Sequence, residues 1–177
     1  MHAFAKDLKH KANSTDENAI LKALLTDTGL GYGNLPKGLL AFHQYETSFR
    51  TPVEEHLVEG ARSANSNGNV FLHLTVSPEH KAKFQELIAS KIEYYENIFN
   101  LKFDISYSEQ KPSTDTIAVN LDNSPFLEGD ESLLFRPAGH GALLENLNDI
   151  EADIIFIKNI DNVVPDRLKA ETITYKK

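Results

Sequence analysis

Helix-like and strand-like patterns alternate along most of the chain, and this alternation constrains the fold more than any other feature of the sequence. Helical spacing covers residues 51–64, 77–99 and 141–149, and strand-like runs cover residues 69–76, 101–107, 116–119, 133–135 and 153–158. Strands that alternate with helices form βαβ units, whose strands run parallel in a sheet covered by the helices. The sequence therefore predicts an α/β fold with a mostly parallel sheet and helices on both faces.

The helix expected at residues 51–64 has a clear start. Thr51 is a favoured cap residue, Pro52 stands at the first helical position, and Glu54 follows the cap by three residues. This pattern is typical of a capping box. Glu54, Glu55 and Glu59 line up along this helix, and we expect them to form a solvated face.

The composition is that of a soluble globular domain. The chain has 177 residues, of which 41% are hydrophobic and 25% charged, so it is long enough to bury a core. It has no cysteine, which excludes disulfides and thiolate metal sites. No run approaches about eighteen apolar residues, and the first residues contain no apolar signal segment. We expect a cytoplasmic protein without a membrane span.

The charge of the chain bears on its partners. The net charge is −8 and the basic residues are scattered, whereas a nucleic-acid surface needs a basic face. We therefore expect no nucleic-acid partner. A small anionic substrate remains compatible, because one or two cations and backbone N–H groups suffice to bind a phosphate.

The chain divides into two parts by pattern. Residues 1–28 are expected to form a polar N-terminal tail with a short helix at residues 19–25, and residues 29–177 the α/β domain. His43, His56, His73 and His80 match no standard metal-ligand spacing. We expect these four residues to be core or surface histidines.

The stretch from Phe135 to Asn162 is the expected ligand site. It contains a Gly-His-Gly loop, a helical pattern and the very apolar run 153–158, which is followed by Asn159, Asp161 and Asn162. Open α/β sheets bind ligands outside the carboxyl ends of their strands. Two structural alternatives stay open. Gly139, His140 and Gly141 could form a simple tight turn before a helix, with His140 as its cap, and Asp161 and Asn162 could cap a helix that starts near Pro165.

Three segments resemble one enzyme family. GNLPKGLLAF (33–42), SEQKPSTDTIAV (108–119), and the pair RPAGHGALLENL (136–147) and FIKNIDNVV (156–164) resemble motifs of sugar nucleotidyltransferases, UDP-sugar pyrophosphorylases in particular. Residues 30–167 also closely resemble a bacterial domain-of-unknown-function family, number 4301. The resemblance implies a nucleotide-diphospho-sugar transferase-like fold of the GT-A type. It implies a reaction in which a sugar-1-phosphate attacks a nucleoside triphosphate and pyrophosphate is released.

The resemblance also assigns roles to individual residues. Lys37 matches a lysine that contacts substrate phosphates, Gln110 a glutamine that reads the uracil edge, and Asp161 an aspartate that binds Mg²⁺. Catalytic roles fall on Lys37 and Asp161. The expected substrate-binding residues are Gln110, Arg136, Gly139, His140, Gly141, Asn159 and Asn162. Arg50 and Arg136 each border an expected ligand loop and are candidates for a phosphate contact.

One departure from the family concerns the triphosphate loop. Such enzymes begin with a strand and a glycine-rich loop, whereas the glycine-rich residues 29–33 follow a helix-like run. A phosphate loop needs the preceding strand to aim it. We therefore expect that the first strand and its loop lie upstream of Met1, that the chain is a piece of a longer protein, and that it is a poor catalyst by itself.

Other functions compete with this hypothesis. The chain could be a non-catalytic α/β binding or interaction domain, in which Lys37 is an ordinary solvated lysine and Gln110 an ordinary loop residue. A dinucleotide-dependent oxidoreductase finds little support, since no G-x-G-x-x-G follows a strand with an acidic residue at the proper distance.

Overall fold

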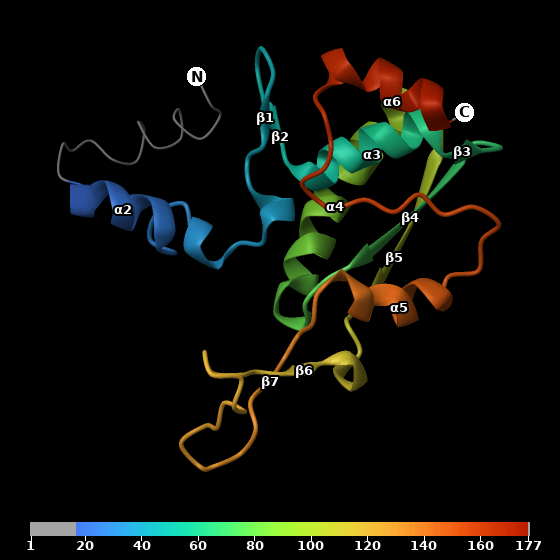
Figure 1. The fold of residues 1–177 in the computed structure, drawn as a ribbon. Helices are drawn as coiled ribbons and strands as arrows, with labels where there is room; N and C mark the ends of the chain where they lie inside the picture. The colour runs from blue at the N-terminus through green and yellow to red at the C-terminus, as the bar shows by residue number, and fades with distance from the viewer. Residues whose placement is uncertain (1–16, 177) are drawn as a thin grey trace. The chain divides into compact units, whose positions relative to one another are not determined.

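A computed structural model describes residues 17–176, which divide into two units (Figure 1). The first unit holds the residues up to Leu72, Glu79–Ile105 and Ile157 onward. The second holds His73–Pro78 and Ser106–Phe156. Most of the predicted N-terminal tail lies outside the described residues. The division expected at residue 28 stays a prediction.

The first unit begins with short elements. Helix α2 spans Glu17–Leu25, and the 3₁₀ helices η1 and η2 span Tyr32–Asn34 and Lys37–Leu39. Strands β1 (His43–Gln44) and β2 (Phe49–Arg50) form an antiparallel pair. The glycine-rich residues 29–33 follow helix α2, as the sequence predicts, and no strand leads into them.

Helix α3 spans Pro52–Ser63 and starts as predicted. The backbone N–H of Glu54 donates to Oγ1 of Thr51 at 3.3 Å, and the backbone N–H of Thr51 donates to Oε2 of Glu54 at 2.9 Å. These reciprocal bonds complete the capping box and satisfy two N–H groups that a helix start would leave without partners.

A βαβ unit forms the centre of the fold. Strand β4 (Asn69–Thr75) leads into helix α4 (Pro78–Phe99) and then into β5 (Lys102–Ser108), with β4 between β5 and the short β3 (Asn65–Ser66). The N–H of Lys102 donates to the carbonyl of Gly68, and the N–H of Val76 donates to that of Ser108. These bonds advance in the same direction on both strands, so β4 and β5 are parallel. Strand β3 is antiparallel to β4.

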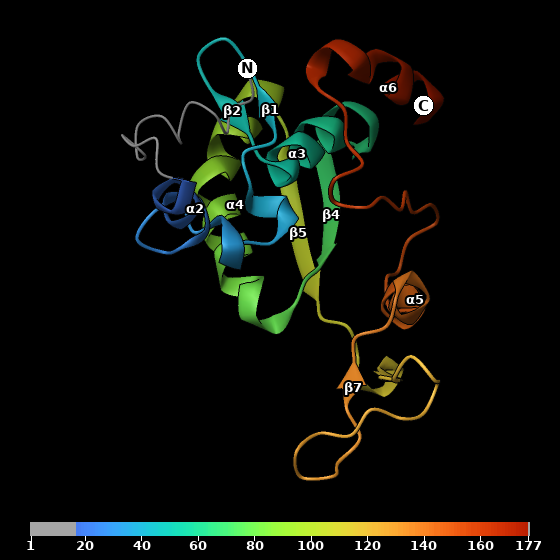
Figure 2. The same cartoon turned by 60° about the vertical axis from the view of Figure 1, so that its left-hand side comes forward.

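The hydrophobic core of the first unit lies between helices α3 and α4 and the strands β4 and β5 (Figure 2). Its buried members are Leu57, Val58, Ala61, Val70, Tyr95, Leu101 and Phe103. The two helices contribute residues at helical spacing and the strands contribute alternate residues, as their sequence patterns predict. Helix α6 (Lys169–Lys176) follows the 3₁₀ helix η5 (Asp166–Leu168) and packs beside α3.

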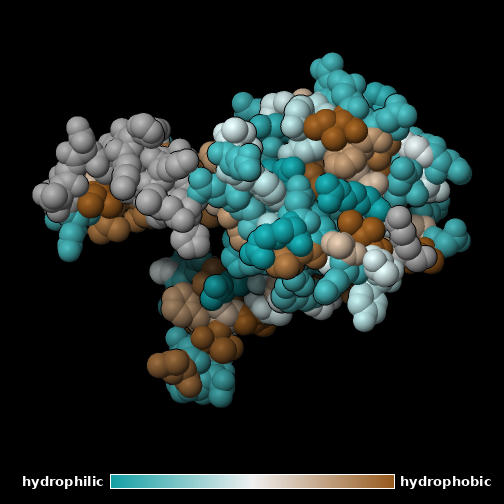
Figure 3. Space-filling model, turned by 90° about the horizontal axis from the view of Figure 1, so that it is seen from above, coloured by the Kyte–Doolittle hydropathy of each residue, from teal (hydrophilic) through white to brown (hydrophobic). Residues whose placement is uncertain are grey.

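The second unit contains short elements with exposed apolar side chains. Strands β6 (Thr116–Ile117) and β7 (Phe135–Arg136) form an antiparallel pair, and η4 (His140–Leu143) continues into helix α5 (Leu144–Asn148). The 3₁₀ helix η3 spans Pro112–Thr114. Figure 3 shows apolar groups at the protein surface. Those of the β6–β7 region include Ile117, Val119, Leu121, Phe126, Leu127, Leu133 and Phe135.

The predicted buried strand at residues 153–158 is wrong. These residues are in no strand, and Ile154 and Ile157 are 76% and 72% exposed. Apolar composition indicates a tendency to be buried, but a strand also needs a neighbour with which to form a ladder. Among the described residues, parallel pairing is limited to β4 and β5, and the fold is a mixture of helices and small sheets.

Candidate functional site

Lys37 and Asp161 meet in the first unit although 124 residues separate them. Nζ of Lys37 donates to Oδ2 of Asp161 at 2.8 Å. The two side chains are 72% and 40% exposed, so this ion pair is open to solvent. The hydrogen bond from Lys37 lowers the pKa of the Asp161 carboxyl group. Both residues predicted to be catalytic therefore lie at one place on the surface.

A tight turn presents Asp161. The backbone N–H of Asn162 donates to the carbonyl of Asn159 at 3.0 Å, which closes a four-residue turn. Asn159, Asp161 and Asn162, predicted to act together, are all exposed on this turn. Pro165 is the cap residue of the next helix and has no side-chain cap bond. The alternative in which Asp161 and Asn162 cap that helix is therefore wrong.

The glycine at position 38 explains how η2, which carries Lys37, comes close to the turn that carries Asp161. A Cβ atom at this position would lie 2.7 Å from Cε1 of Phe84 and 3.0 Å from Cγ1 of Ile160. Real Cβ atoms essentially never come as close as the first of these distances. Only glycine lets η2 lie against the turn that carries Asp161. The position of Lys37 beside Asp161 thus depends on the residue that follows it.

Helix α3 holds the other side of the turn. Nε2 of His56 lies 3.0 Å from the carbonyl oxygen of Ile160, and Nζ of Lys158 lies 2.8 Å from Oε1 of Glu59. Burial lowers the pKa of His56. Burial acts to raise the pKa of Glu59, but the ammonium groups of Lys158 and Lys176 outweigh it and lower that pKa.

The glutamates of α3 do not form a solvated face, so that prediction is wrong. Glu54, Glu55 and Glu59 are only 4%, 0% and 2% exposed. The side chain of Glu55 accepts hydrogen bonds from Lys169, from Nδ1 of His43 at 3.0 Å and from the hydroxyl of Tyr45 at 2.6 Å. Burial and the bond to Glu55 raise the pKa of Tyr45 to about 12, so this hydroxyl stays a donor at neutral pH.

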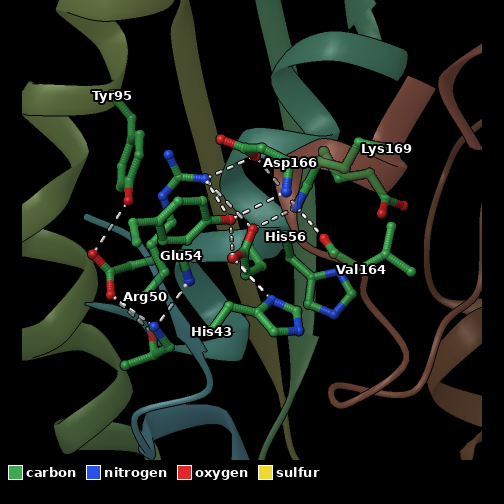
Figure 4. A network of polar contacts seen from close by, with 12 residues as sticks. His43, Arg50, Glu54, His56, Tyr95, Val164, Asp166 and Lys169 are labelled. Carbon is green, nitrogen blue, oxygen red and sulfur yellow. Dashed lines mark hydrogen bonds and ion pairs between the residues drawn. The ribbon is translucent and has the colours of Figure 1, made fainter. Parts of the chain in front are cut away.

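Figure 4 shows how side chains from separate elements converge on this buried network. Arg50 donates to Oδ1 of Asp166 at 2.9 Å and stacks on the ring of Tyr45 at 4.3 Å. Burial acts to lower the pKa of Arg50, but the bond to Asp166 outweighs it and raises that pKa. The guanidinium predicted to meet a phosphate is engaged inside the protein. Local sequence patterns do not reveal this network, because Asp166 lies 116 residues along the chain from Arg50 and Lys169 lies 114 residues from Glu55.

The remaining predicted residues lie in the second unit. Nε2 of Gln110 donates to Oδ1 of Asp115 at 3.1 Å, which fixes the orientation of the Gln110 amide. Arg136 is exposed in β7, and His140 is exposed at the start of η4. The cap residue of η4 is Gly139, with no side-chain cap bond. The backbone N–H of Ala142 donates to the carbonyl of Gly139 at 3.0 Å, so these residues do form a tight turn before a helix. The cap is Gly139, so the alternative in which His140 caps the helix is wrong.

Gly139 and Gly141 leave open space beside their backbone. No atom lies within 4 Å of the position that a Cβ atom would take at either residue. Gly139 has a φ of −71°, which any residue can adopt. Neither packing nor the backbone angle explains glycine at position 139. An exposed backbone without side chains is suited to close approach by a ligand.

The family is established by comparison with known protein families. A family described as "Domain of unknown function (DUF4301)" matches residues 1–177. The chain belongs to this family. No curated protein matches it, and no solved structure does.

The DUF4301 chain offers two separate sets of candidate residues. Lys37, Asn159, Asp161 and Asn162 lie in the first unit, and Gln110, Arg136, Gly139, His140 and Gly141 in the second. Within residues 17–176, no three His, Cys, Asp or Glu side chains are arranged to hold a metal ion. No helix in the same range is both long and apolar enough to cross a membrane.

Proposed function

We propose that this DUF4301 chain is a nucleotidyltransferase-like domain that binds a nucleotide or nucleotide-sugar together with Mg²⁺. The observation that carries the proposal is the 2.8 Å contact between Lys37 and Asp161. One residue is the cation expected to meet a phosphate and the other is the carboxylate expected to meet the metal. Their contact beside an exposed turn supports assigning both roles to one site.

The donor set at the turn fits Mg²⁺. The carboxylate of Asp161 and the side-chain amide oxygens of Asn159 and Asn162 are hard oxygen ligands. Mg²⁺ typically binds through one or two carboxylates together with substrate phosphates and waters, so a single carboxylate is sufficient. When bound, the ion supplies charge neutralisation at the phosphate oxygens.

Because the ion pair of Lys37 and Asp161 is exposed to solvent, each residue can exchange this partner for a ligand. Solvent-exposed ion pairs contribute little to stability, so the contact between Lys37 and Asp161 is easily opened. A metal ion held by Asp161 would take the place of the lysine there. The ammonium of Lys37 would then be available to neutralise a substrate phosphate.

The proposed reaction is transfer of a nucleotidyl group to a sugar-1-phosphate. A phosphate oxygen of the sugar-1-phosphate forms a bond to the α-phosphorus of a nucleoside triphosphate. The bond from that phosphorus to the bridging oxygen of the β-phosphate breaks, and pyrophosphate leaves. Such a transfer needs positioning and charge neutralisation rather than a protein nucleophile. Lys37 and Asp161 are the residues that this chain contributes to the reaction.

The second unit supports the proposal by its own features. Gly139 and Gly141 expose backbone without a packing reason for glycine, and His140 between them is exposed. Gln110 presents an amide that a neighbouring carboxylate orients. An oriented amide is suited to read the edge of a base by hydrogen bonds.

Calorimetric titration of the chain tests the proposal. The chain is titrated with the common nucleoside triphosphates and with nucleotide-sugars, with and without Mg²⁺. We expect Mg²⁺-dependent binding that Asp161→Asn abolishes and that Lys37→Met weakens. The substitution Gly141→Ala should also weaken binding, whereas Gly129→Ala, at a glycine that likewise has open space around it, should not. No binding of any nucleotide would overturn the proposal.

A non-catalytic interaction domain is the second candidate, favoured by the exposed apolar side chains of the β6–β7 region. Leu121 is fully exposed, and Val119 and Phe135 are each 56% exposed. Apolar groups that gather on a surface often mark protein interaction sites. Release of pyrophosphate from nucleoside triphosphate and sugar-1-phosphate separates the two candidates, since only the enzyme produces it.

A further inference from the structure

We propose that His56 is a positioning residue that holds the Asp161 turn against helix α3. The inference rests on the proposed function, in which Asp161 receives the metal. Nε2 of His56 lies 3.0 Å from the carbonyl oxygen of Ile160, the residue directly before Asp161. His56 acts through the backbone and touches neither metal nor phosphate.

The geometry fixes the tautomer of His56. A carbonyl oxygen only accepts hydrogen bonds, so Nε2 must carry the proton and donate. In the neutral ring, Nδ1 is then unprotonated. Burial lowers the pKa of this histidine, which keeps the ring neutral at pH 7 and the tautomer defined.

Two ion pairs of α3 bracket the turn along the chain. Glu59 binds Lys158 on the N-terminal side of the turn, and Glu55 binds Lys169 on its C-terminal side. These ion pairs attach the chain to α3 on both sides of the turn. Neither of them involves the four residues of the turn itself. Within residues 17–176, the bond from His56 is the hydrogen bond that joins an α3 side chain to the turn itself.

The contacts on the opposite face of the turn show why the hydrogen bond from His56 matters. Ile160 packs toward Gly38, and the next residue meets Lys37. The carbonyl of Ile160 belongs to the peptide unit that leads into Asp161. Fixing this peptide limits the directions in which the carboxylate can point. Loss of the bond therefore loosens the contact between Lys37 and Asp161 without removing either residue.

The pKa of Asp161 reports on that contact and is measured without any nucleotide. Carboxyl carbon NMR titration is applied to the wild type and to His56→Leu, which removes the donor and keeps an apolar side chain. We expect the pKa of Asp161 to rise toward its ordinary value. In His56→Gln, whose amide can donate to the same carbonyl, we expect it to stay low. His73→Leu is the matched control, because His73 contacts Ser106 and Ser108 in the second unit.

Two results would overturn the proposal. One is an unchanged pKa of Asp161 in a folded His56→Leu protein, and the other is an equal rise in His56→Gln. If His56→Leu does not fold, the tautomer of His56 in the wild type is the test instead. Nitrogen NMR must show a proton on Nε2, and a proton on Nδ1 alone refutes the positioning role.

Nucleotide affinity separates this inference from the proposed function. If the wild type binds a nucleotide with Mg²⁺, His56→Leu should weaken that binding about fivefold, the effect expected when one hydrogen bond is lost. If the wild type binds none, the proposed function fails. The NMR measurements would still establish whether His56 positions Asp161.

Discussion

Lys169 and Glu55 form an ion pair in which both side chains are fully buried. The ammonium of Lys169 also donates to the carbonyl of Val164. Charges inside a protein are tolerated when they are paired and hydrogen-bonded. This pair joins the start of helix α6 to helix α3 across 114 residues of chain. It therefore contributes to holding the segment that carries Asp161.

Substitution Lys169→Met is expected to destabilise the first unit by about 3–5 kcal/mol, because it leaves the carboxylate of Glu55 buried without its main partner. Urea unfolding followed by circular dichroism measures the change. The control is Lys111→Met, which removes a partly exposed lysine paired with Asp149 and should leave the unfolding midpoint unchanged. Equal midpoints for the wild type and Lys169→Met would show that the buried pair is not formed.

Gly38→Ala is expected to destabilise the protein by about 1–3 kcal/mol, the usual range for overpacking a core. The added Cβ atom would collide with Phe84 and press on Ile160. The same change should raise the pKa of Asp161, since it pushes Lys37 away from the turn. Gly129→Ala, which meets no atom within 4 Å, is the control. A fully stable Gly38→Ala protein would argue against this close approach.

Local signals in the sequence predicted the central elements well. The cap at Thr51, the helix of α4 and the strands β4 and β5 each follow from patterns within a few neighbouring residues. The helical residues 141–149 are likewise found, as η4 and α5. Such features depend on the chain's nearest neighbours, which a sequence displays directly.

Features that depend on distant residues could not be predicted in this way. The burial of Glu55 depends on Lys169, and the need for glycine at position 38 depends on Ile160. The run 153–158 is apolar enough for a buried strand, but no partner strand pairs with it among the described residues. A family resemblance points to Lys37 and Asp161, and only the fold shows that they touch.

The stability of the protein is expected to fall as the pH drops from 7 toward 5, in part because of His56. Burial holds its folded-state pKa below the ordinary value of 6.5. Between the folded and unfolded pKa values the unfolded chain binds a proton that the folded one does not, so acid favours unfolding. His73, whose pKa burial also lowers, adds to the effect. Unfolding midpoints at several pH values should decline less steeply in His56→Gln.

A second loss of stability is expected at lower pH and is due to Glu59. Its folded-state pKa lies below the ordinary 4.5, because the attraction of Lys158 and Lys176 outweighs the effect of burial. A depressed carboxyl pKa stabilises the folded state above the unfolded pKa, and this contribution disappears as the pH falls through the folded pKa.

The substitution Glu59→Gln tests this second contribution. It removes the titrating group but keeps a similar shape, so the variant should be less stable than the wild type at pH 7. The difference between the two should shrink as the pH falls below about 4.5 and should disappear once the wild-type carboxyl group is protonated in the folded state as well. Urea unfolding between pH 3 and 7 measures both proteins. A constant difference across this range would show that the charge of Glu59 does not contribute, and that Lys158 is held over α3 by packing instead.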